Sequence, residues 1–317
     1  MRIAFLGLGL IGGSIARAMA ADSVRDEPLG DGGPWELTAW TPDGHGPRAA
    51  LAAGVIAAAA GSAAEAIEGA DLVVLAAPPL DCLGLLDGLA GHGGLAAGAF
   101  VTDVASTKTE IVARAAALGV PFIGGHPMAG LEKSGFAAAD PGLFLGRPWV
   151  VTATDSTPDA GIELVVRLAR STGADPIVMT PAEHDAAVAG ISHLPLIVAA
   201  ALVESVVGPA GGADRPDWPA ARALSATGWA SMTRLARGDV SMATGIAATN
   251  GAAIAERLRD LEAVIAAWRA DLEHGDRATM ESRFTAARAT LVASEPPDDA
   301  VRTTAPPAAQ PSDVADR

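Results

Sequence analysis

The chain opens with a short apolar segment, a glycine-rich turn and an alanine-rich helix, in that order. The segment Arg2–Leu6 has the composition of a strand, and Gly7, Gly9 and Gly12 follow it. In this spacing the first glycine makes the tight turn, the second lets the backbone approach a pyrophosphate, and the third packs the helix against the strand. The N-terminus of a helix at this place binds phosphate. The pattern therefore predicts a dinucleotide-binding fold rather than a merely structural glycine turn. The expected cofactor contacts here are Gly7, Gly9, Leu10, Ile11 and Gly12.

The first 180 residues alternate strand-like and helix-like segments. Short apolar runs separated by helices are typical of a mostly parallel sheet that is covered on both faces. A stretch rich in Asp, Gly and Pro, Asp22–Pro34, indicates a long surface loop. The expected strands are Arg2–Leu6, Glu36–Thr41, Asp71–Ala76, Phe100–Asp103, Pro121–Gly124, Trp149–Thr152 and Pro176–Met179.

From Thr180 onward the sequence has helical periodicity and no convincing strand. Thr180 and Glu183 have the spacing of a capping box, with a proline at the first helical position. We expect this helix to continue through Leu202 and to kink at Pro195, which has no N–H to donate. Further helices are expected over Ala220–Arg237, Ser241–Leu272 and Arg277–Ala293.

The expected fold class is α/β, with a Rossmann-like dinucleotide-binding domain over residues 1–180 and an all-α dimerisation domain over 181–294. The dimer follows from composition, because apolar helices with little else to cover them often pair with a second subunit. The last stretch, 295–317, is Pro, Ala, Asp and Thr with almost no large apolar residue, which predicts disorder.

Charge and composition exclude several classes of protein. The 317 residues carry a net charge of −15 without a basic patch, which argues against a nucleic-acid binder. The single cysteine, Cys82, can form no internal disulfide and cannot build a zinc site alone, so no metal is expected. No uninterrupted apolar run reaches the length of a membrane span, and glycines interrupt the apolar N-terminus, unlike in a signal peptide. We therefore expect a cytoplasmic protein that does not bind membranes.

The end of the second expected strand decides between NAD and NADP. An acidic residue there would hold the ribose 2′-hydroxyl of NAD. That position is Thr41, while Asp43 comes two residues later and Arg48 follows. Thr41 would not repel a 2′-phosphate and Arg48 would attract one, so both cofactors stay open, with NAD slightly favoured.

Polar side chains follow two further strands, at the carboxyl ends where open α/β sheets bind ligands. Asp103 ends one strand and faces the cofactor side, Ser106 could hydrogen-bond a substrate oxygen, and Lys108 could either hold a carboxylate or orient the loop. His126 follows the strand Pro121–Gly124 among glycines, which predicts an exposed, shaped loop. Because its ordinary pKa lies near neutrality, a histidine suits the removal of a proton from an alcohol as hydride leaves.

The helical part carries fewer chemical signals. Ser192 and His193 lie beside the kink at Pro195, which can turn polar groups into a cleft. Arg234 has the planar fork that matches a carboxylate, although a lone arginine is more often a surface residue. The other histidines, His45, His92, His184 and His274, are interpreted as structural or surface residues.

Together these pieces resemble the prephenate and arogenate dehydrogenases of tyrosine biosynthesis. The matching strings occur in the same order and span roughly residues 1 to 250. They are Gly7-Leu-Gly-Leu-Ile-Gly-Gly-Ser14, Thr102-Asp-Val-Ala-Ser-Thr-Lys108, Gly125-His-Pro-Met-Ala-Gly-Leu-Glu-Lys-Ser-Gly135, His184-Asp185, Ser192-His-Leu-Pro195 and Thr233-Arg234.

The resemblance implies an oxidative decarboxylation of a cyclohexadienol with hydride transfer to NAD(P)+. It implies that His126 polarises or deprotonates the ring hydroxyl, that Ser106 supports that hydroxyl, and that Arg234 binds a substrate carboxylate. Further substrate contacts are expected from Ser192, His193 and Lys108, and cofactor contacts from the glycine turn, Thr41 and Asp103. Many relatives carry a second histidine where this chain has Leu196; if that histidine recognises the keto-acid side chain of prephenate, its absence here argues for arogenate as substrate.

Two other functions fit the pattern less well. A β-hydroxyacid dehydrogenase would normally use a lysine in the helical domain, and the helical segments from Thr180 to Ala293 contain none. A dimer that binds NAD(P) without chemistry would not need His126 and Arg234 in their matching contexts. The leading hypothesis is therefore prephenate dehydrogenase, with arogenate dehydrogenase as the alternative.

Overall fold

The computed structural model describes residues 1–21, 35–92, 95–131, 133–209 and 211–294. The expected loop over Asp22–Pro34 and the expected disorder over 295–317 lie outside the described residues. The chain divides into two compact units, the first spanning Met1–Asp260 and the second beginning at Leu261. Because the first unit includes both the sheet and the helices up to Asp260, the domain boundaries expected near residue 180 stay a prediction.

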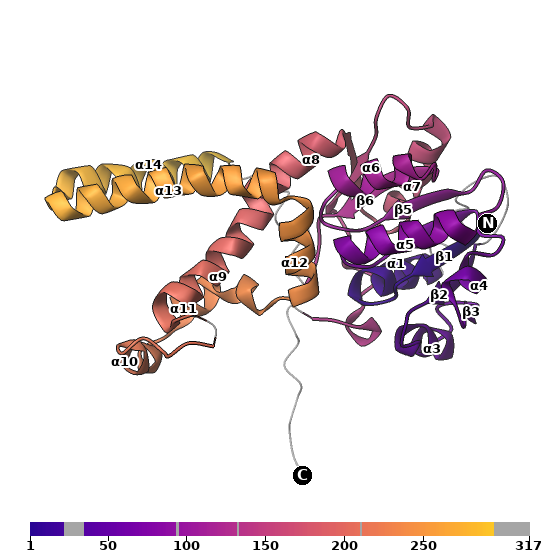
Figure 1. Cartoon of the computed structure of the whole chain (residues 1–317), viewed down its shortest axis with the longest axis horizontal. Helices are drawn as coiled ribbons and strands as arrows, with labels where there is room; N and C mark the ends of the chain where they lie inside the picture. The colour runs from indigo at the N-terminus through magenta and orange to yellow at the C-terminus, as the bar shows by residue number, and fades with distance from the viewer. Residues whose placement is uncertain (22–34, 93–94, 132, 210, 295–317) are drawn as a thin grey trace, which may run out of the picture. The chain divides into compact units, whose positions relative to one another are not determined.

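The first unit is built around one eight-stranded sheet with the order β3-β2-β1-β4-β5-β6-β7-β8 (Figure 1). Strands β1 to β6 are all parallel to their neighbours, and β7 pairs antiparallel with β6. The order of the first six is that of the doubly wound dinucleotide-binding fold. The strands are β1 (Arg2–Leu6), β2 (Glu36–Trp40), β3 (Ala58–Ala59), β4 (Leu72–Leu75), β5 (Phe100–Asp103), β6 (Phe122–Pro127), β7 (Pro148–Thr152) and β8 (Asp175–Met179).

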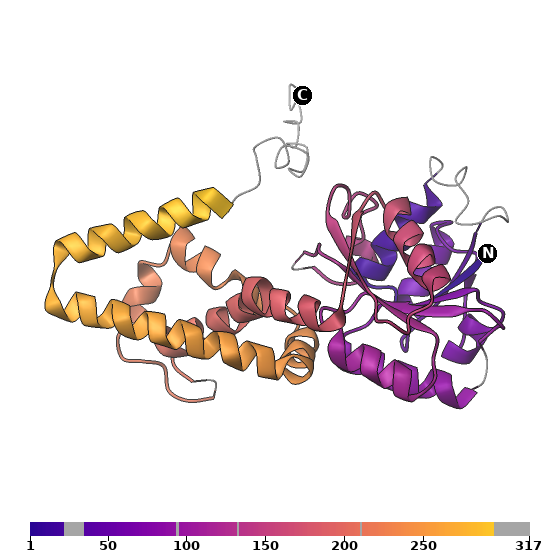
Figure 2. The ribbon, with the colours of Figure 1, turned by 90° about the horizontal axis from the view of Figure 1, so that it is seen from above.

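Alternating side chains of the strands enter two separate apolar cores. Ile3 and Phe5 belong to one core, whereas Ala4 and Leu6 belong to the other, as the period of two in a strand requires. Helices cover both faces of the sheet, which is why the central strands are apolar on both sides (Figure 2). One core includes α1 (Leu10–Ala20), α3 (His45–Ala52) and α7 (Asp159–Ser171); the other includes α4 (Ala63–Ile67), α5 (Pro79–His92) and α6 (Thr109–Ala117).

All seven expected strands are present, with two main differences. The two-residue strand β3 was too short to stand out in the sequence. Strand β6 continues through His126 and Pro127, because these residues pair with Val150 and Trp149 of the antiparallel β7. His126 therefore lies on the end of a strand, and the glycines before it are buried strand residues rather than part of an exposed loop.

The segment after the sheet is a long apolar helix with a break in its middle. It comprises α8 (Pro181–Val188), a π-helical turn (Ala189–His193) and α9 (Leu194–Val207). The capping box predicted at Thr180 and Glu183 is present at its start. The irregular turn lies directly before Pro195, whose missing N–H disturbs the helical hydrogen bonds.

By length and composition alone this helix could cross a membrane, although no uninterrupted apolar run in it reaches the length of a span. Its 27 residues include a window of mean hydropathy 2.1, of which 22% is buried within the chain. Ser192 and His193 interrupt the apolar run, but the mean hydropathy of the helix stays high. One such helix is weak evidence, because apolar helices of soluble proteins pass the same test.

Two of the helices expected after Val207 are divided into shorter ones, whereas the third, expected over Arg277–Ala293, is present as α14 (Arg277–Ser294). The stretch expected as Ala220–Arg237 is divided into α10 (Trp218–Ala223), α11 (Thr227–Met232) and a 3₁₀ turn (Arg234–Arg237). The stretch expected as Ser241–Leu272 breaks at Asn250 into α12 (Val240–Thr249) and α13 (Gly251–His274). Asp239 caps α12 through its hydrogen bond from the Met242 N–H.

The described part of the second unit is a helical hairpin. It joins the end of α13 to α14 (Arg277–Ser294) through Gly275, which has a positive φ of 70°. The guanidinium of Arg283 pairs with Asp271 at 2.9 Å and lies over the ring of Trp268. Large apolar side chains of the hairpin are exposed, among them Val264, Ile265, Leu272, Phe284, Leu291 and Val292.

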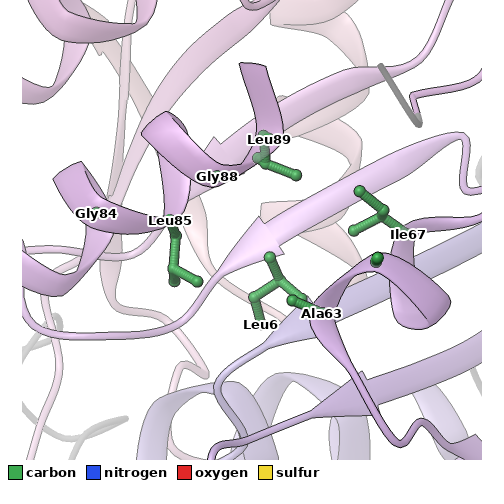
Figure 3. Close-up of a pocket in the computed structure, with 8 residues that line it drawn as sticks. Leu6, Ala63, Ile67, Gly84, Leu85, Gly88 and Leu89 are labelled. Carbon is green, nitrogen blue, oxygen red and sulfur yellow. The ribbon is translucent and has the colours of Figure 1, made fainter. Parts of the chain in front are cut away.

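A small apolar cavity of about 80 Å³ lies between α4 and α5 (Figure 3). Leu6, Ile67, Leu85 and Leu89 line it, and no ionisable side chain does. It therefore offers no group for acid–base chemistry.

Candidate active site

In the glycine turn after β1, two glycines pack closely against backbone atoms and one faces open space. Gly7 has a φ of 105°, and a Cβ there would lie 2.2 Å from the carbonyl oxygen of Ala76. A Cβ on Gly12 would lie 2.7 Å from the carbonyl oxygen of Gly7. A Cβ on Gly9, in contrast, would meet nothing within 4 Å. The first and third glycines are therefore needed for packing, while the second leaves open space where a ligand could approach the backbone.

A cavity of about 660 Å³ adjoins this turn. It is lined by Gly9, by Thr41 and Asp43 after β2, and by Phe136 on the opposite side. Helix α1 begins at Leu10 with no side-chain cap and no acidic residue in its first turn, so its N-terminal N–H groups suit a phosphate. This arrangement fits a dinucleotide, whose pyrophosphate the N-terminal N–H groups of α1 would hold.

Asp43 organises the loop at the ribose end of that cavity. Its Oδ1 accepts hydrogen bonds from Thr41 Oγ1 at 2.9 Å and from the His45 N–H at 3.0 Å. These hydrogen bonds, the one from His45 first, lower the pKa of Asp43. Arg48 donates to the Asp43 carbonyl oxygen at 3.0 Å and lies 3.3 Å from His45 Nδ1.

Asp103 and Lys108 form a fully buried ion pair. The Lys108 ammonium also donates to the Gly125 carbonyl oxygen at 2.8 Å, and Asp103 accepts from the Gly125 N–H at 3.0 Å. Both side chains thus hold the peptide units next to His126. Of the two roles expected for Lys108, these contacts favour orientation of the loop over a substrate carboxylate. Asp103 likewise faces the interior and is not exposed to a cofactor.

His126 is the last residue but one of β6 and is 8% exposed. The glycines before it allow this strand to pack closely, since a Cβ on Gly124 would lie 2.3 Å from Thr152 Oγ1 and one on Gly125 2.6 Å from the Asp103 carbonyl oxygen. Burial, supported by the electrostatic influence of His184, Lys108 and His193, places the pKa of His126 well below its ordinary value. The imidazole is therefore neutral near pH 7, which is the form that accepts a proton.

His126 stands at the end of a chain of hydrogen-bonded groups. Its Nδ1 lies 2.8 Å from His184 Nε2, and His184 Nδ1 lies 2.8 Å from Asp185 Oδ1. The two rings meet edge to face, with 5.0 Å between their centroids. The sequence interpretation assigned no chemistry to His184. The string Glu183-His184-Asp185 next to the kinked helix was a signal, but nothing in it indicated the contact with β6.

His193 lies on the π-helical turn and is fully buried. Asn250 donates from Nδ2 to the Asp185 carbonyl oxygen at 2.9 Å, and the same Nδ2 lies 3.1 Å from His193 Nδ1. Burial lowers the pKa of His193 to about 4, against the opposing effects of Asp185 and of the Ser106 backbone. The structure thus brings Ser106, His193 and Asp185 into one neighbourhood.

Two residues expected at the substrate are exposed. Ser192 precedes His193 on the turn, and Arg234 begins the 3₁₀ turn that packs against α9. The neighbouring Thr233 is buried, and its hydroxyl donates to the Trp229 carbonyl oxygen at 2.8 Å. The part of Arg234 in a site stays a prediction. Among the described residues there is no group of three or more His, Cys, Asp or Glu that could hold a metal ion.

Comparison with known proteins agrees with this geometry. Residues 40–178 match the family model described as the nucleotide-binding domain of prephenate dehydrogenase, and residues 180–285 match its dimerization domain. The chain belongs to the prephenate dehydrogenase family. The two matches meet at the junction between β8 and α8, and they assign a dimerisation domain to the part with the exposed apolar helices.

Individual relatives support the same assignment. The chain is 35% identical over 244 residues to the prephenate dehydrogenase of Bacillus subtilis, covering 76% of this chain and 62% of the relative. It is 32% identical to that of Lactococcus lactis, covering 82% and 68%. The chain thus spans somewhat under two thirds of the length of the Bacillus protein and somewhat over two thirds of the Lactococcus one.

Solved structures share the whole architecture. The arogenate dehydrogenase of Synechocystis aligns with a TM-score of 0.73 at 28% identity, covering 92% of this chain and 98% of that one. The prephenate dehydrogenase of A. aeolicus, in complex with hydroxyphenyl propionate and NAD+, aligns with a TM-score of 0.76 at 24% identity over the same shares. These likenesses show the expected fold, a parallel-sheet nucleotide-binding domain followed by helices.

Proposed function

We propose that this protein is a prephenate dehydrogenase, which converts prephenate to 4-hydroxyphenylpyruvate and CO2 in tyrosine biosynthesis. The observation that carries the proposal is His126, a neutral, nearly buried imidazole at the carboxyl end of a strand in a nucleotide-binding domain. Family membership supports the reaction class, and the geometry supports the base. The non-catalytic alternative, a dimer that only binds NAD(P), gives no reason for a buried imidazole with a lowered pKa.

In this reaction His126 accepts the proton of the ring hydroxyl. The bound nicotinamide supplies the acceptor for the hydride that leaves the same ring carbon. The bond to the ring carboxylate then breaks, its electron pair makes the ring aromatic, and CO2 departs. His126 returns its proton to the oxygen that becomes the phenol, so the base is regenerated in each turnover.

The other site residues would hold the substrate. Ser106 would hydrogen-bond the ring hydroxyl from the loop after β5, and His193 and Ser192 would contribute from the π-helical turn. Arg234 would bind a carboxylate, because a guanidinium pairs with a carboxylate through two parallel hydrogen bonds. Against the chain's net charge of −15, such local positive groups are needed to hold an anionic substrate.

We propose NAD+ as the preferred cofactor over NADP+. Asp43 lines the cavity at the ribose end and is held as a carboxylate by hydrogen bonds that lower its pKa. A carboxylate can accept a hydrogen bond from a ribose hydroxyl and repels a phosphate at the same place. Arg48 is engaged with the Asp43 carbonyl oxygen and therefore has a partner already.

The glycine turn offers a test of cofactor binding that does not depend on turnover. Gly9→Ala places a methyl group in the open space and should weaken NAD+ binding, measured by calorimetry, while leaving the melting temperature close to that of the wild type. Gly7→Ala should instead lower the melting temperature, because its Cβ meets the Ala76 carbonyl oxygen. Unchanged NAD+ affinity in Gly9→Ala would exclude the turn as the pyrophosphate site.

Arogenate is the alternative substrate. Leu196 stands in α9 where many relatives have a histidine, and a structural neighbour that covers nearly the whole chain is named arogenate dehydrogenase. The two substrates differ only in the side chain, which is an α-keto acid in prephenate and an α-amino acid in arogenate. Product analysis decides, since prephenate yields 4-hydroxyphenylpyruvate and arogenate yields tyrosine.

We also propose that the protein acts as a cytoplasmic homodimer through its helical domain, residues 181–294. The match to a dimerization domain and the exposed large apolar residues of α13 and α14 support this assembly. Burial of such a surface against a second copy would also cover the apolar helix Pro181–Val207 without a membrane. Sedimentation of the detergent-free protein tests this, and a monomer at micromolar concentration would contradict it.

A further inference from the structure

We propose that His184 and Asp185 fix the His126 ring in the tautomer that carries its proton on Nδ1. This leaves Nε2 as the bare nitrogen that accepts the proton of the substrate. His184 and Asp185 are then positioning residues that act through His126. The role in catalysis rests on the proposed function of His126 as the base, whereas the tautomer itself is a property of the protein without substrate.

The series of hydrogen bonds that leads to His126 begins at the Asp185 carboxylate, which backbone N–H groups hold in place. Asp185 accepts hydrogen bonds at 2.8 Å from the backbone N–H groups of Lys108 and Thr109, in addition to the contact with His184. Partial burial works to raise the pKa of Asp185, but the hydrogen bonds from His184, Thr109 and Lys108 outweigh it and lower the pKa. Asp185 is therefore ionised near pH 7 and can only accept hydrogen bonds.

The Asp185 carboxylate determines which ring nitrogen of each histidine in this series carries a proton. Because Asp185 is an acceptor only, His184 must carry a proton on Nδ1. In the arrangement that we propose, His184 Nε2 carries no proton and accepts a hydrogen bond from His126 Nδ1 across the 2.8 Å between them. His126 consequently donates from Nδ1, and its own neutral form has the lone pair on Nε2.

The surroundings of His126 keep it in this neutral form before the reaction. The titratable groups that act on it are His184 from α8, Lys108 from the loop before α6 and His193 from the π-helical turn. When Nε2 has accepted the substrate proton, His126 is positively charged. The hydrogen bond to His184 and the negative charge of the Asp185 carboxylate stabilise this form. No proton has to travel along the chain for this stabilisation.

The orientation of the His126 ring depends on residues of α8, whereas His126 itself belongs to β6. Asp185 lies on α8, and its carboxylate caps the start of α6 through Lys108 and Thr109. Asn250 holds the carbonyl of the same residue from the end of α12. A separate contact, between the hydroxyls of Thr107 and Thr249 at 2.7 Å, joins the same elements without touching the imidazole chain.

The direct test is nitrogen NMR of the histidine rings in the intact protein without substrate, labelled with 15N at histidine. We expect the His126 signals to show the proton on Nδ1 and a bare Nε2. His126→Asn, which removes its signals, provides the assignment. A proton on Nε2 in the wild type would overturn the proposal, whether or not the protein turns over prephenate. If the enzyme turns over prephenate but His126 has the other tautomer, the tautomer proposal is wrong and the proposed function stands. If His126 has the expected tautomer but the protein has no activity, the proposed function is wrong and the tautomer stands.

Kinetics of variants test the positioning role. His184→Leu removes the acceptor for His126 and should lower kcat by roughly 10²-fold or more, with a much smaller change in KM. His184→Gln keeps an acceptor oxygen near the same place and should recover part of that loss. Thr249→Val removes the separate contact between the elements and should leave kcat and the His126 tautomer near those of the wild type. Equal losses in all three variants would contradict a specific role for His184.

Asp185→Asn provides a second readout. The amide oxygen can take the place of Oδ1, which accepts from both the Lys108 N–H and His184 Nδ1, so the His126 tautomer should persist in the NMR spectrum while the negative charge that stabilises protonated His126 is lost. We then expect the acid limb of the kcat/KM pH profile to shift together with the loss of kcat. If this variant does not fold, the wild-type tautomer and the His184 pair still decide the proposal.

Discussion

His126 Nδ1 lies 2.8 Å from His184 Nε2, although the two residues are 58 positions apart in the chain. His126 is the last residue but one of a strand of the sheet, and His184 belongs to the first helix after the sheet. The contact orients the imidazole of the proposed base so that its other nitrogen is left for a ligand. The proposed role of His126 as a base thus depends on His184 and Asp185, which belong to α8.

Replacement of His126 with Asn separates the base from its support. The asparagine amide can still donate toward His184 from the position of Nδ1, while the nitrogen that accepts the proton is lost. We expect kcat to fall by roughly 10² to 10⁴, with the dissociation constant for NAD+ nearly unchanged, as measured by steady-state kinetics and calorimetry. A rate equal to that of the wild type would remove His126 from the mechanism.

Replacement of Lys108 with Met should destabilise the fold rather than weaken substrate binding alone. The change leaves the Asp103 carboxylate buried without its partner, which typically costs about 3–5 kcal/mol. Urea denaturation measures the loss. Arg114→Met is the matched control, because Arg114 pairs with Asp87 at the surface, where ion pairs contribute about 1 kcal/mol or less. Wild-type stability together with a raised KM would instead assign Lys108 to the substrate.

Replacement of Arg234 with Ala should mainly raise KM for the substrate. Charge-assisted hydrogen bonds contribute about 1.5–3 kcal/mol, which corresponds to an increase of roughly 10- to 100-fold. Arg237→Ala is the control, since Arg237 lies on the same 3₁₀ turn and is also exposed. Equal effects of both variants would indicate general loss of positive charge, and an unchanged KM in Arg234→Ala would refute the carboxylate assignment.

The buried histidines predict how stability depends on pH. The pKa of His193 is lowered from 6.5 to about 4, so between these values the unfolded chain binds a proton that the folded chain does not. Stability from this group is complete above the unfolded pKa and is lost as the pH falls, with a slope of at most about 1.4 kcal/mol per pH unit. His126 contributes in the same direction, whereas burial raises the pKa of Asp103 and opposes it.

Comparison with His193→Asn isolates this contribution. The asparagine keeps an acceptor for Asn250 but has no group that titrates. Urea denaturation between pH 4.5 and 7.5, values chosen to lie roughly across the window where His193 would titrate, should show a shallower dependence in the variant than in the wild type. Parallel curves would mean that His193 is not buried as a neutral ring.

Most of the fold was predictable because local patterns and topology agree. Short apolar runs of strand length between helices predicted seven of the eight strands, and the capping box predicted the start of α8. The failures have physical causes. Strand β6 continues through His126 only because β7 pairs with it antiparallel, and a tertiary pairing leaves no mark on the strand itself. The break at Asn250 depends on its contacts with Asp185 and His193.

The candidate site was predictable to the extent that it is local. The glycine turn and His126 are short motifs attached to recognisable elements. The roles of Lys108 and His184 depend instead on which groups their side chains meet after folding. Lys108 follows a strand, as a substrate ligand would, but its amine turns inward to Asp103 and Gly125. His184 contacts Asp185 within its own helix, but its contact with His126 emerged only from the structure.

The most direct test of the proposed activity is the initial rate of NAD(P)H formation, measured by absorbance, with each pairing of prephenate or arogenate with NAD+ or NADP+. The account predicts the highest kcat/KM for prephenate with NAD+, and loss of that rate in His126→Asn. A higher value with arogenate or NADP+ would overturn the corresponding specificity alone. No turnover in any of the four pairings, from folded protein that binds NAD+, would contradict the proposed function.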